Sequence, residues 1–114
     1  MQLVNLTSGT VLAEKLMVAR DFKNRLTGLI GRTGLNQGEA LILLPCKSIH
    51  TFFMTFPIDV IFLSRESVVL RVMENLKPFR FSPVVPRSFA VVELPEGSLS
   101  ATGTRAGHIL QVNL

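Results

Sequence analysis

The sequence has no tryptophan, no tyrosine and only one cysteine, Cys46. An intrachain disulfide is therefore excluded, and the small secreted proteins that depend on disulfides usually carry an even number of cysteines. Segment 1–7 contains none of the basic residues that open a secretion signal. These features predict a cytoplasmic protein, because thiols stay reduced in that compartment.

Long hydrophobic runs are also missing. The longest apolar runs, 40–44 and 60–63, are far shorter than the ~20 residues that a membrane-spanning helix needs. We therefore expect a soluble protein without a membrane span.

Strong local charge is absent as well. Charged residues make up 18% of the chain, the net charge is +4, and the basic residues are spread from Lys15 to Arg105 without a run. Nucleic-acid-binding proteins usually gather positive charge on one surface and place aromatic side chains within it. A nucleic-acid partner is therefore not favoured. Eight of the twelve basic residues are arginine, whose planar guanidinium suits a small anion.

The chain does contain many apolar residues, 47% of its 114. Such a chain can bury a core without disulfides or metal, so we expect a single domain over 1–114. Short runs of Val, Ile, Leu and Phe alternate with turn residues, which is typical of a β-rich protein. We predict the α+β class, with a bent antiparallel or mixed sheet or a small barrel. The predicted strands are 3–6, 11–18, 40–44, 48–54, 59–64, 67–76, 88–94 and 108–113.

One segment has helical periodicity instead. Its apolar residues recur at the spacing of one helix face, and they are Phe22, Leu26, Leu29 and Ile30. Asp21 stands where an N-cap belongs and Gly31 where a helix often ends. The pattern predicts one main helix over about 21–31 that packs this face on the sheet. Pro95 further predicts a short helical turn at 96–102.

Three stretches carry a family resemblance. They are RLTGLIGR at 25–32, PCKSIHTFFMTFPIDVIFL at 45–63 and VVELPEG at 91–97, with Ala106-Gly107-His108 downstream. Their order and spacing resemble the domain of unknown function 192 family over about residues 12–112. The resemblance implies a compact β-rich fold with short helices, and it implies no activity. Many relatives resemble exported proteins, and they often have an acidic residue where this chain has His108.

The middle stretch holds the residues that could perform catalysis: Cys46, His50 and Asp59. They could act as nucleophile, base and orienting acid. Residues four apart on a strand lie ~13 Å apart, so His50 reaches Cys46 only if the chain bends between them. A thiol-dependent or hydrolase-like enzyme is therefore the alternative hypothesis.

A soft-metal site is a further alternative. Thiolate, imidazole and thioether ligands suit copper, and Cys46, His50 and Met54 supply these groups. They cannot meet on one straight strand without a further methionine, such as Met17 or Met73, from a neighbouring strand. We therefore assign no metal ligands and expect no cofactor.

The leading hypothesis is a small non-catalytic binding or accessory module. Its partner would be a small ligand, with anions among the candidates, or another protein, because a few convergent donors in a concave site suffice for binding. The expected ligand-binding residues are His50, Ser48, Thr51, Arg25, Arg32 and Arg87.

Overall fold

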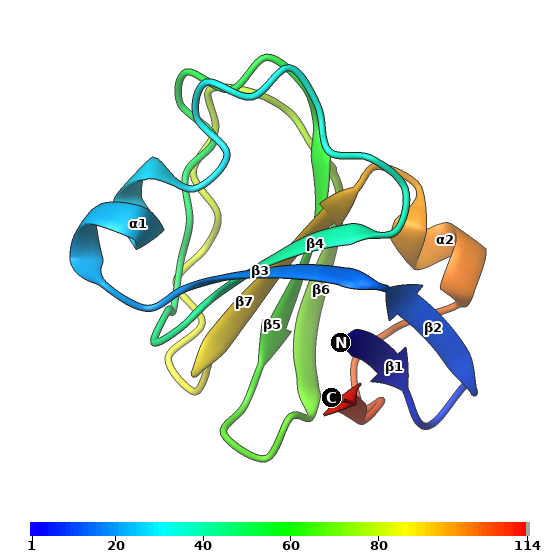
Figure 1. The fold of residues 1–114 in the computed structure, drawn as a ribbon. Coiled ribbons are helices and arrows are strands. Elements are labelled where there is room, and N and C mark those ends of the chain that lie inside the picture. Colours follow the sequence, from blue (N-terminus) through cyan, green and yellow to red (C-terminus); the bar gives the residue numbers. More distant parts are fainter. Residues whose placement is uncertain (114) are drawn as a thin grey trace.

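The computed structural model describes residues 1–113, apart from the side chains of Phe22 and Leu26. Within these residues, eight strands and two short helices follow the chain (Figure 1). In order they are β1 (Gln2–Asn5), β2 (Thr10–Ala13), β3 (Lys15–Ala19), α1 (Phe22–Thr27), β4 (Glu39–Leu43), β5 (Ile58–Leu63), β6 (Val69–Leu76), β7 (Ala90–Pro95), α2 (Ser98–Thr102) and β8 (Leu110–Asn113). The β-rich α+β class is confirmed.

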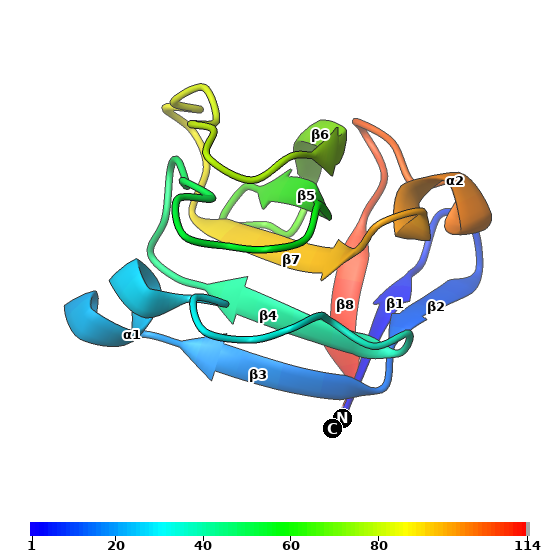
Figure 2. The ribbon, with the colours of Figure 1, turned by 90° about the horizontal axis from the view of Figure 1, so that it is seen from above.

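The described strands form two separate sheets, so the predicted alternative of a small closed barrel is wrong. The smaller sheet has the order β2-β1-β8, and the larger has the order β3-β4-β7-β5-β6. Strands β3 and β4 pair in parallel, and the other pairs are antiparallel. Because β1 pairs with β8, the two ends of the chain lie side by side (Figure 2).

Successive side chains of the central strands point to opposite faces of the larger sheet, so the core has two parts. On one face of the larger sheet, Ile61 and Val92 pack with residues of the smaller sheet and with Leu99 of α2. On the other face, Val60 and Val91 pack against the segments that contain Leu29, Ile49 and Met54. Because both faces are covered, all six residues of β5 are buried, as expected for a central strand. The described helices are too short to cross a membrane.

Helix α1 is shorter than the predicted helix 21–31. Its N-cap is Asp21, as predicted, and the Asp21 carboxylate accepts a hydrogen bond of 2.8 Å from the Asn24 amide. Gly28 ends the helix at φ +49°, a conformation that glycine adopts without strain. Leu29 is buried and Ile30 half-buried just after the helix. The predicted packing of the Phe22 and Leu26 side chains lies outside the described residues.

The predicted strand 11–18 is two strands in different sheets. The break falls at Glu14, where the amides of Glu14 and Lys15 both donate to the carbonyl of Gly38, at 2.8 and 2.9 Å. Apolar residues flank the adjacent charged residues Glu14 and Lys15 on both sides, and this charged pair marks the break within the apolar stretch.

The predicted strand 48–54 is also wrong, because this stretch belongs to an irregular loop. Loop 44–57 connects β4 to β5, and it runs antiparallel to loop 77–89, which connects β6 to β7 (Figure 1). The Thr51 amide donates to the Arg80 carbonyl at 2.8 Å, and the Ser82 amide to the Ile49 carbonyl at 2.9 Å. The two loops therefore brace each other, with one isolated bridge between His50 and Phe81.

Candidate functional site

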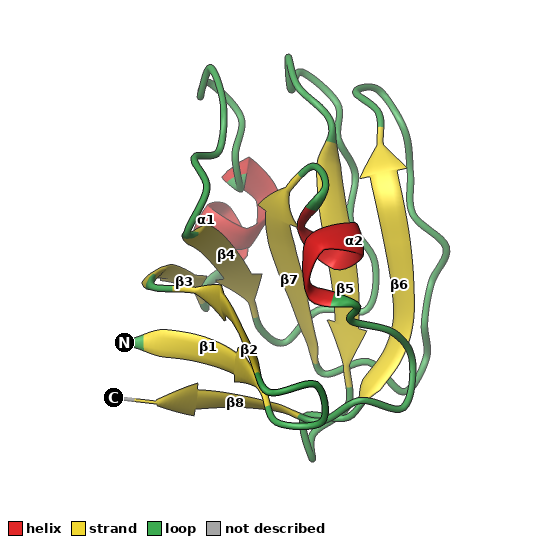
Figure 3. Cartoon of the chain, turned by 90° about the vertical axis from the view of Figure 1, so that its right-hand side faces the viewer, coloured by secondary structure: helices red, strands yellow, loops and turns green. Residues whose placement is uncertain are grey.

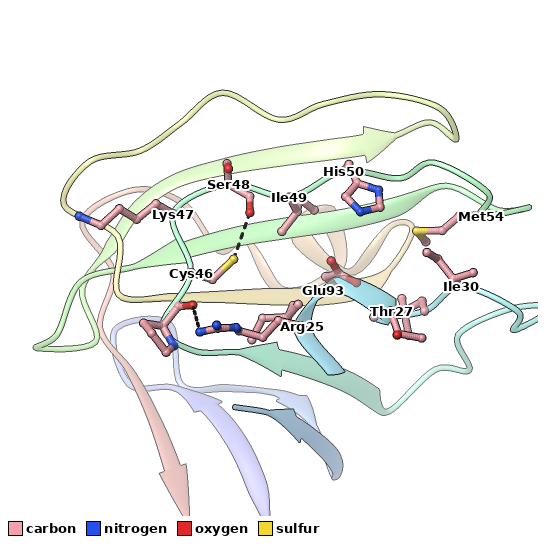
Figure 4. Close-up of a pocket in the computed structure, with 14 residues that line it drawn as sticks. Arg25, Thr27, Ile30, Cys46, Lys47, Ser48, Ile49, His50, Met54 and Glu93 are labelled. Atoms are coloured by element: carbon pink, nitrogen blue, oxygen red, sulfur yellow. Dashed lines mark hydrogen bonds between the residues drawn. The ribbon is translucent and has the colours of Figure 1, made fainter. Parts of the chain in front are cut away.

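A cavity of about 280 Å³ lies where the end of α1 and loop 44–57 meet one face of the larger sheet (Figure 4). Its apolar lining includes Leu29, Ile49 and Met54. Its polar lining includes Arg25, Cys46, Ser48, His50 and Glu93. Three separate segments thus contribute to one site, and this volume lies near the lower end of the range for small-molecule sites.

Glu93 lies on the inner side of this cavity, in the middle of the larger sheet. On β7 it pairs with Leu41 of β4 on one side and with Val60 of β5 on the other. Two-residue alternation puts its side chain on the same face as Val91. Glu93 is 3% exposed, and within the described residues its Oε1 atom has no hydrogen-bond partner.

The protonation state of Glu93 follows from this burial. Loss of hydration disfavours the charged form and raises the pKa of Glu93 to about 8. Arg25 lines the same cavity, but its Nη1 donates to the Pro45 carbonyl at 2.9 Å. The one ion pair among the described residues joins Arg32 to Glu39. Glu93 therefore has no pairing cation, and its neutral acid form predominates near pH 7.

A buried acid without a partner is costly. An unsatisfied buried polar group destabilises a fold by about 1–3 kcal/mol, and such groups are rare enough to need an explanation. Titratable groups whose pKa is strongly shifted, lying in a cleft, are often functional. Glu93 meets both criteria, and it is the residue that most distinguishes this cavity from a packing defect.

Cys46 is half-buried beside Glu93 and remains a thiol. Its Sγ donates to the Ser48 carbonyl at 3.1 Å. Burial raises the pKa of the Cys46 thiol, and negative charge on Glu93 acts in the same direction. Because the thiolate is the nucleophilic form, these surroundings oppose nucleophilic catalysis.

His50 also points to partners other than Cys46. Its Nδ1 accepts a hydrogen bond of 3.2 Å from the Phe52 amide, so the neutral ring carries its proton on Nε2. Its ring stacks on Phe52 with centroids 5.6 Å apart. No hydrogen bond joins Cys46 to His50, both of which are fully described. The structure therefore does not bring the two together as nucleophile and base.

Asp59 lies on the opposite face of the sheet from the cavity. Its neighbours on β5, Ile58 and Val60, belong to the core on the cavity side, so alternation turns Asp59 the other way. It is buried, and its two carboxylate oxygens accept from the amides of Asn75 at 2.9 Å and Leu99 at 2.8 Å. Both carboxylate oxygens thus bind backbone amides on the face away from the cavity, so Asp59 does not orient His50 there.

The predicted ligand-binding residues divide into two groups. Arg25, Ser48 and His50 line the cavity together. Thr51 is buried, and its hydroxyl donates to the Lys77 carbonyl at 2.6 Å and accepts from the Arg80 amide at 2.9 Å. The remaining two are Arg32, which pairs with Glu39, and Arg87, which lines a different hollow with Lys47 and Arg65.

Sequence reasoning missed Glu93. The signal was present in Val91-Val92-Glu93-Leu94, where one acid interrupts a run of apolar residues in a predicted buried strand. An acid at such a position is almost never fully buried unless it is paired, so its place in a predicted buried strand marks Glu93 as a candidate functional residue.

Metal ligation has little support at this site. Among the described residues, no three of the histidine, cysteine, aspartate and glutamate side chains gather as metal ligands. The Met17 Sδ, one of the sulfurs that a copper site would need, accepts a hydrogen bond from Arg32 at 3.1 Å.

The fold and the cavity define a small α+β protein with a ligand-sized, partly polar site against its main sheet. The chain belongs to the domain of unknown function 192 family, described as an uncharacterized ACR, whose model matches residues 4–112. It is similar to a UPF0127 protein from Thermococcus sibiricus, 36% identical over 92% of this chain and 70% of that protein. It is also similar to a UPF0127 protein from Pyrococcus furiosus, 32% identical over 97% of both.

A solved structure shares the fold. A protein of unknown function from Novosphingobium aromaticivorans superposes with a TM-score of 0.86 at 25% sequence identity, over 98% of this chain and 84% of that one. The family is thus uncharacterised, and these comparisons indicate no specific function.

Proposed function

We propose that the chain acts as one domain, a non-catalytic module that binds a small ligand with an anionic oxygen in the cavity above Glu93. The observation that carries this proposal is the buried Glu93 carboxyl group, which lines the cavity without a hydrogen-bond partner among the described residues. A ligand oxygen would accept a hydrogen bond from the neutral carboxyl group of Glu93 and remove the cost of leaving that group unsatisfied.

The charge around the cavity supports an anion. Arg25 and Lys47 contribute to its lining, and both have more donors than their single bonds to the carbonyls of Pro45 and Pro86 use. The Nε2–H of His50 is another donor. Glu93 is the one acidic residue in the lining, and it is mostly neutral near pH 7. The lining therefore offers several donors and positive charge.

The same residues support catalysis less well than they support binding. Cys46 is held as a thiol, and His50 uses its Nδ1 lone pair on a backbone amide. A cytoplasmic location accompanies the proposal, since Cys46 is a free cysteine and free thiols persist in reducing compartments.

A panel of small carboxylates and phosphate monoesters, each beside its neutral amide or alcohol, tests the proposal. Binding at pH 6.5 would be followed by amide chemical shifts, which should move at Gly28 and Ser48 when the cavity fills. Glu93→Leu should weaken binding about tenfold, the value of roughly one hydrogen bond. Glu93→Gln keeps a neutral donor and should retain binding within about threefold.

The control is Glu96→Gln, an exposed acid three residues along the chain, which should bind as the wild type does. Wild-type affinity should fall as the pH rises through about 8, because ionised Glu93 cannot donate and repels an anion. Affinity that rises with pH, or shifts confined to residues outside the cavity, would refute the proposal.

A further inference from the structure

Four phenylalanines form a cluster at one end of the molecule, which we call the aromatic tip: Phe52, Phe53, Phe79 and Phe81. Ring centroids lie 4.7 Å apart for Phe52 and Phe81, 6.2 Å for Phe52 and Phe79, and 5.8 Å for Phe53 and Phe79. Phe53, Phe79 and Phe81 are 71%, 54% and 72% exposed. The rings thus contact each other, and three of the four leave most of their surface in water while Phe52 is half-buried.

The parts of the two loops that carry the aromatic tip lie at the same end of the larger sheet. Loop 44–57 leads into the start of β5, and loop 77–89 leaves the end of β6 (Figure 3). Because β5 and β6 are antiparallel, these two points adjoin. The tip is therefore a protrusion rather than a groove.

Two residues of the aromatic tip have a strained backbone conformation. Phe53 has φ +64° and Phe79 φ +59°, left-handed conformations that cost a bulky residue about 1–2 kcal/mol each. Such strain persists mainly where function requires it. Burial does not compensate for it here, since both rings are more than half exposed.

Basic residues lie beside the aromatic tip. Lys77 and Arg80 flank Phe79 in the sequence, and both are exposed. Loops 44–57 and 77–89 contain no aspartate or glutamate. The tip therefore combines exposed apolar rings with adjacent positive charge.

We propose that the aromatic tip docks on the surface of an anionic lipid bilayer, with its phenylalanines in the interface and its basic residues among the headgroups. Exposed phenylalanine beside lysine and arginine is the composition of peripheral membrane-binding surfaces. The tip adjoins the Glu93 cavity through the stacked rings of Phe52 and His50, but the proposal does not depend on the ligand of that cavity.

Vesicle flotation tests the proposal with the full chain. Vesicles of phosphatidylcholine with about 30% phosphatidylglycerol should bind the protein at least tenfold better than phosphatidylcholine alone, and higher salt should weaken that binding. The triple variant Phe53→Ala, Phe79→Ala, Phe81→Ala should lose at least about tenfold in partitioning. The single variant Phe81→Ala removes an exposed ring without touching a left-handed residue, and it should lose about threefold.

The matched control removes exposed apolar side chains elsewhere: Leu6→Ala, Val11→Ala and Ile109→Ala, none of which lies in the two loops. It should float as the wild type does. Lys77→Gln with Arg80→Gln should weaken binding to the anionic vesicles about tenfold or more. The proposal is overturned if neither vesicle binds, if the phenylalanine variants bind as the wild type does, or if the tip instead binds a single-stranded oligonucleotide or another protein.

Discussion

Two consecutive residues of loop 44–57, His50 and Thr51, have different environments. The His50 ring is half-buried at the cavity, and among the described residues its one side-chain hydrogen bond is the 3.2 Å contact with the Phe52 amide. The Thr51 side chain is buried, and its hydroxyl joins loop 44–57 to loop 77–89 through the Lys77 carbonyl and the Arg80 amide. The sequence placed both in one ligand-binding group, because side-chain chemistry alone does not reveal which way a loop residue faces.

We expect Thr51→Val to lower the free energy of unfolding by about 1 kcal/mol, because it removes the hydrogen bonds of the Thr51 hydroxyl to the Lys77 carbonyl and the Arg80 amide while keeping the side-chain shape. We expect His50→Ala to change it by no more than about 0.5 kcal/mol, in the range of surface substitutions. Urea denaturation of both variants beside the wild type measures this contrast. A large loss in the histidine variant would show that His50 is structural and would remove it from the proposed site.

At the scale of elements, Asp59 connects the three elements β5, β6 and α2 through hydrogen bonds. From β5 it accepts hydrogen bonds from the amide of Asn75 in β6 and from the amide of Leu99 in α2. Asn75 has φ +53°, and the register between β5 and β6 is irregular between Ile58 and Val60. The carboxylate thus satisfies an amide at the point where the regular ladder is interrupted.

We expect Asp59→Asn to lower the free energy of unfolding by about 1–3 kcal/mol, because an amide group has one acceptor oxygen and two backbone donors compete for it. The matched control is Asp21→Asn at the exposed N-cap of α1, where asparagine caps as well as aspartate and the change should stay within about 0.5 kcal/mol. Thermal and urea unfolding provide the comparison. Equal effects at both positions would contradict the role assigned to Asp59.

Strands that consist of a short, nearly continuous apolar run between turn residues could be predicted from the sequence. The strands expected at 40–44, 59–64 and 88–94 correspond to β4, β5 and β7 within two residues at each end. The stretch 48–54 was also predicted as a strand, but it pairs only irregularly with loop 77–89, which contains three prolines. Which loops meet, and hence where a cavity forms, depends on long-range pairing that no local pattern encodes.

Because long-range pairing could not be predicted, only part of the ligand-binding site could be predicted. Three of the six predicted ligand-binding residues line the cavity, namely Arg25, Ser48 and His50. Two of these lie close together in loop 44–57. Glu93 reaches the cavity only because β7 occupies the middle of the sheet, and strand order could not be read from the sequence.

At the scale of the whole molecule, the position of Glu93 couples its ionisation to global unfolding. The residue is buried in the central strand of the five-stranded sheet, so water reaches its carboxyl group fully only when the sheet opens. Burial raises the pKa of Glu93 to about 8 in the folded state, against about 4.3 for an exposed glutamate. Between these two pH values the folded chain holds a proton that the unfolded chain has released.

Linkage then fixes the sign of the pH effect, because stability falls with rising pH wherever the folded state binds more protons. The contribution of neutral Glu93 is fully present below about pH 4, is lost progressively as the pH rises, and is gone once the pH passes about 8. Glu93→Gln cannot ionise, so its free energy of unfolding should match the wild type near pH 4. It should exceed the wild type above pH 8 by a few kcal/mol, at about 1.4 kcal/mol per pKa unit.

Urea denaturation of both proteins across pH 4–9 measures this difference, and the other titrating groups cancel because the two chains share them. Glu96→Gln is the matched control at an exposed acid, and its difference from the wild type should stay near zero at every pH. A difference between the wild type and Glu93→Gln that does not change with pH would show that Glu93 is solvated in the folded protein. The neutral hydrogen-bond donor assigned to the cavity would then be lost.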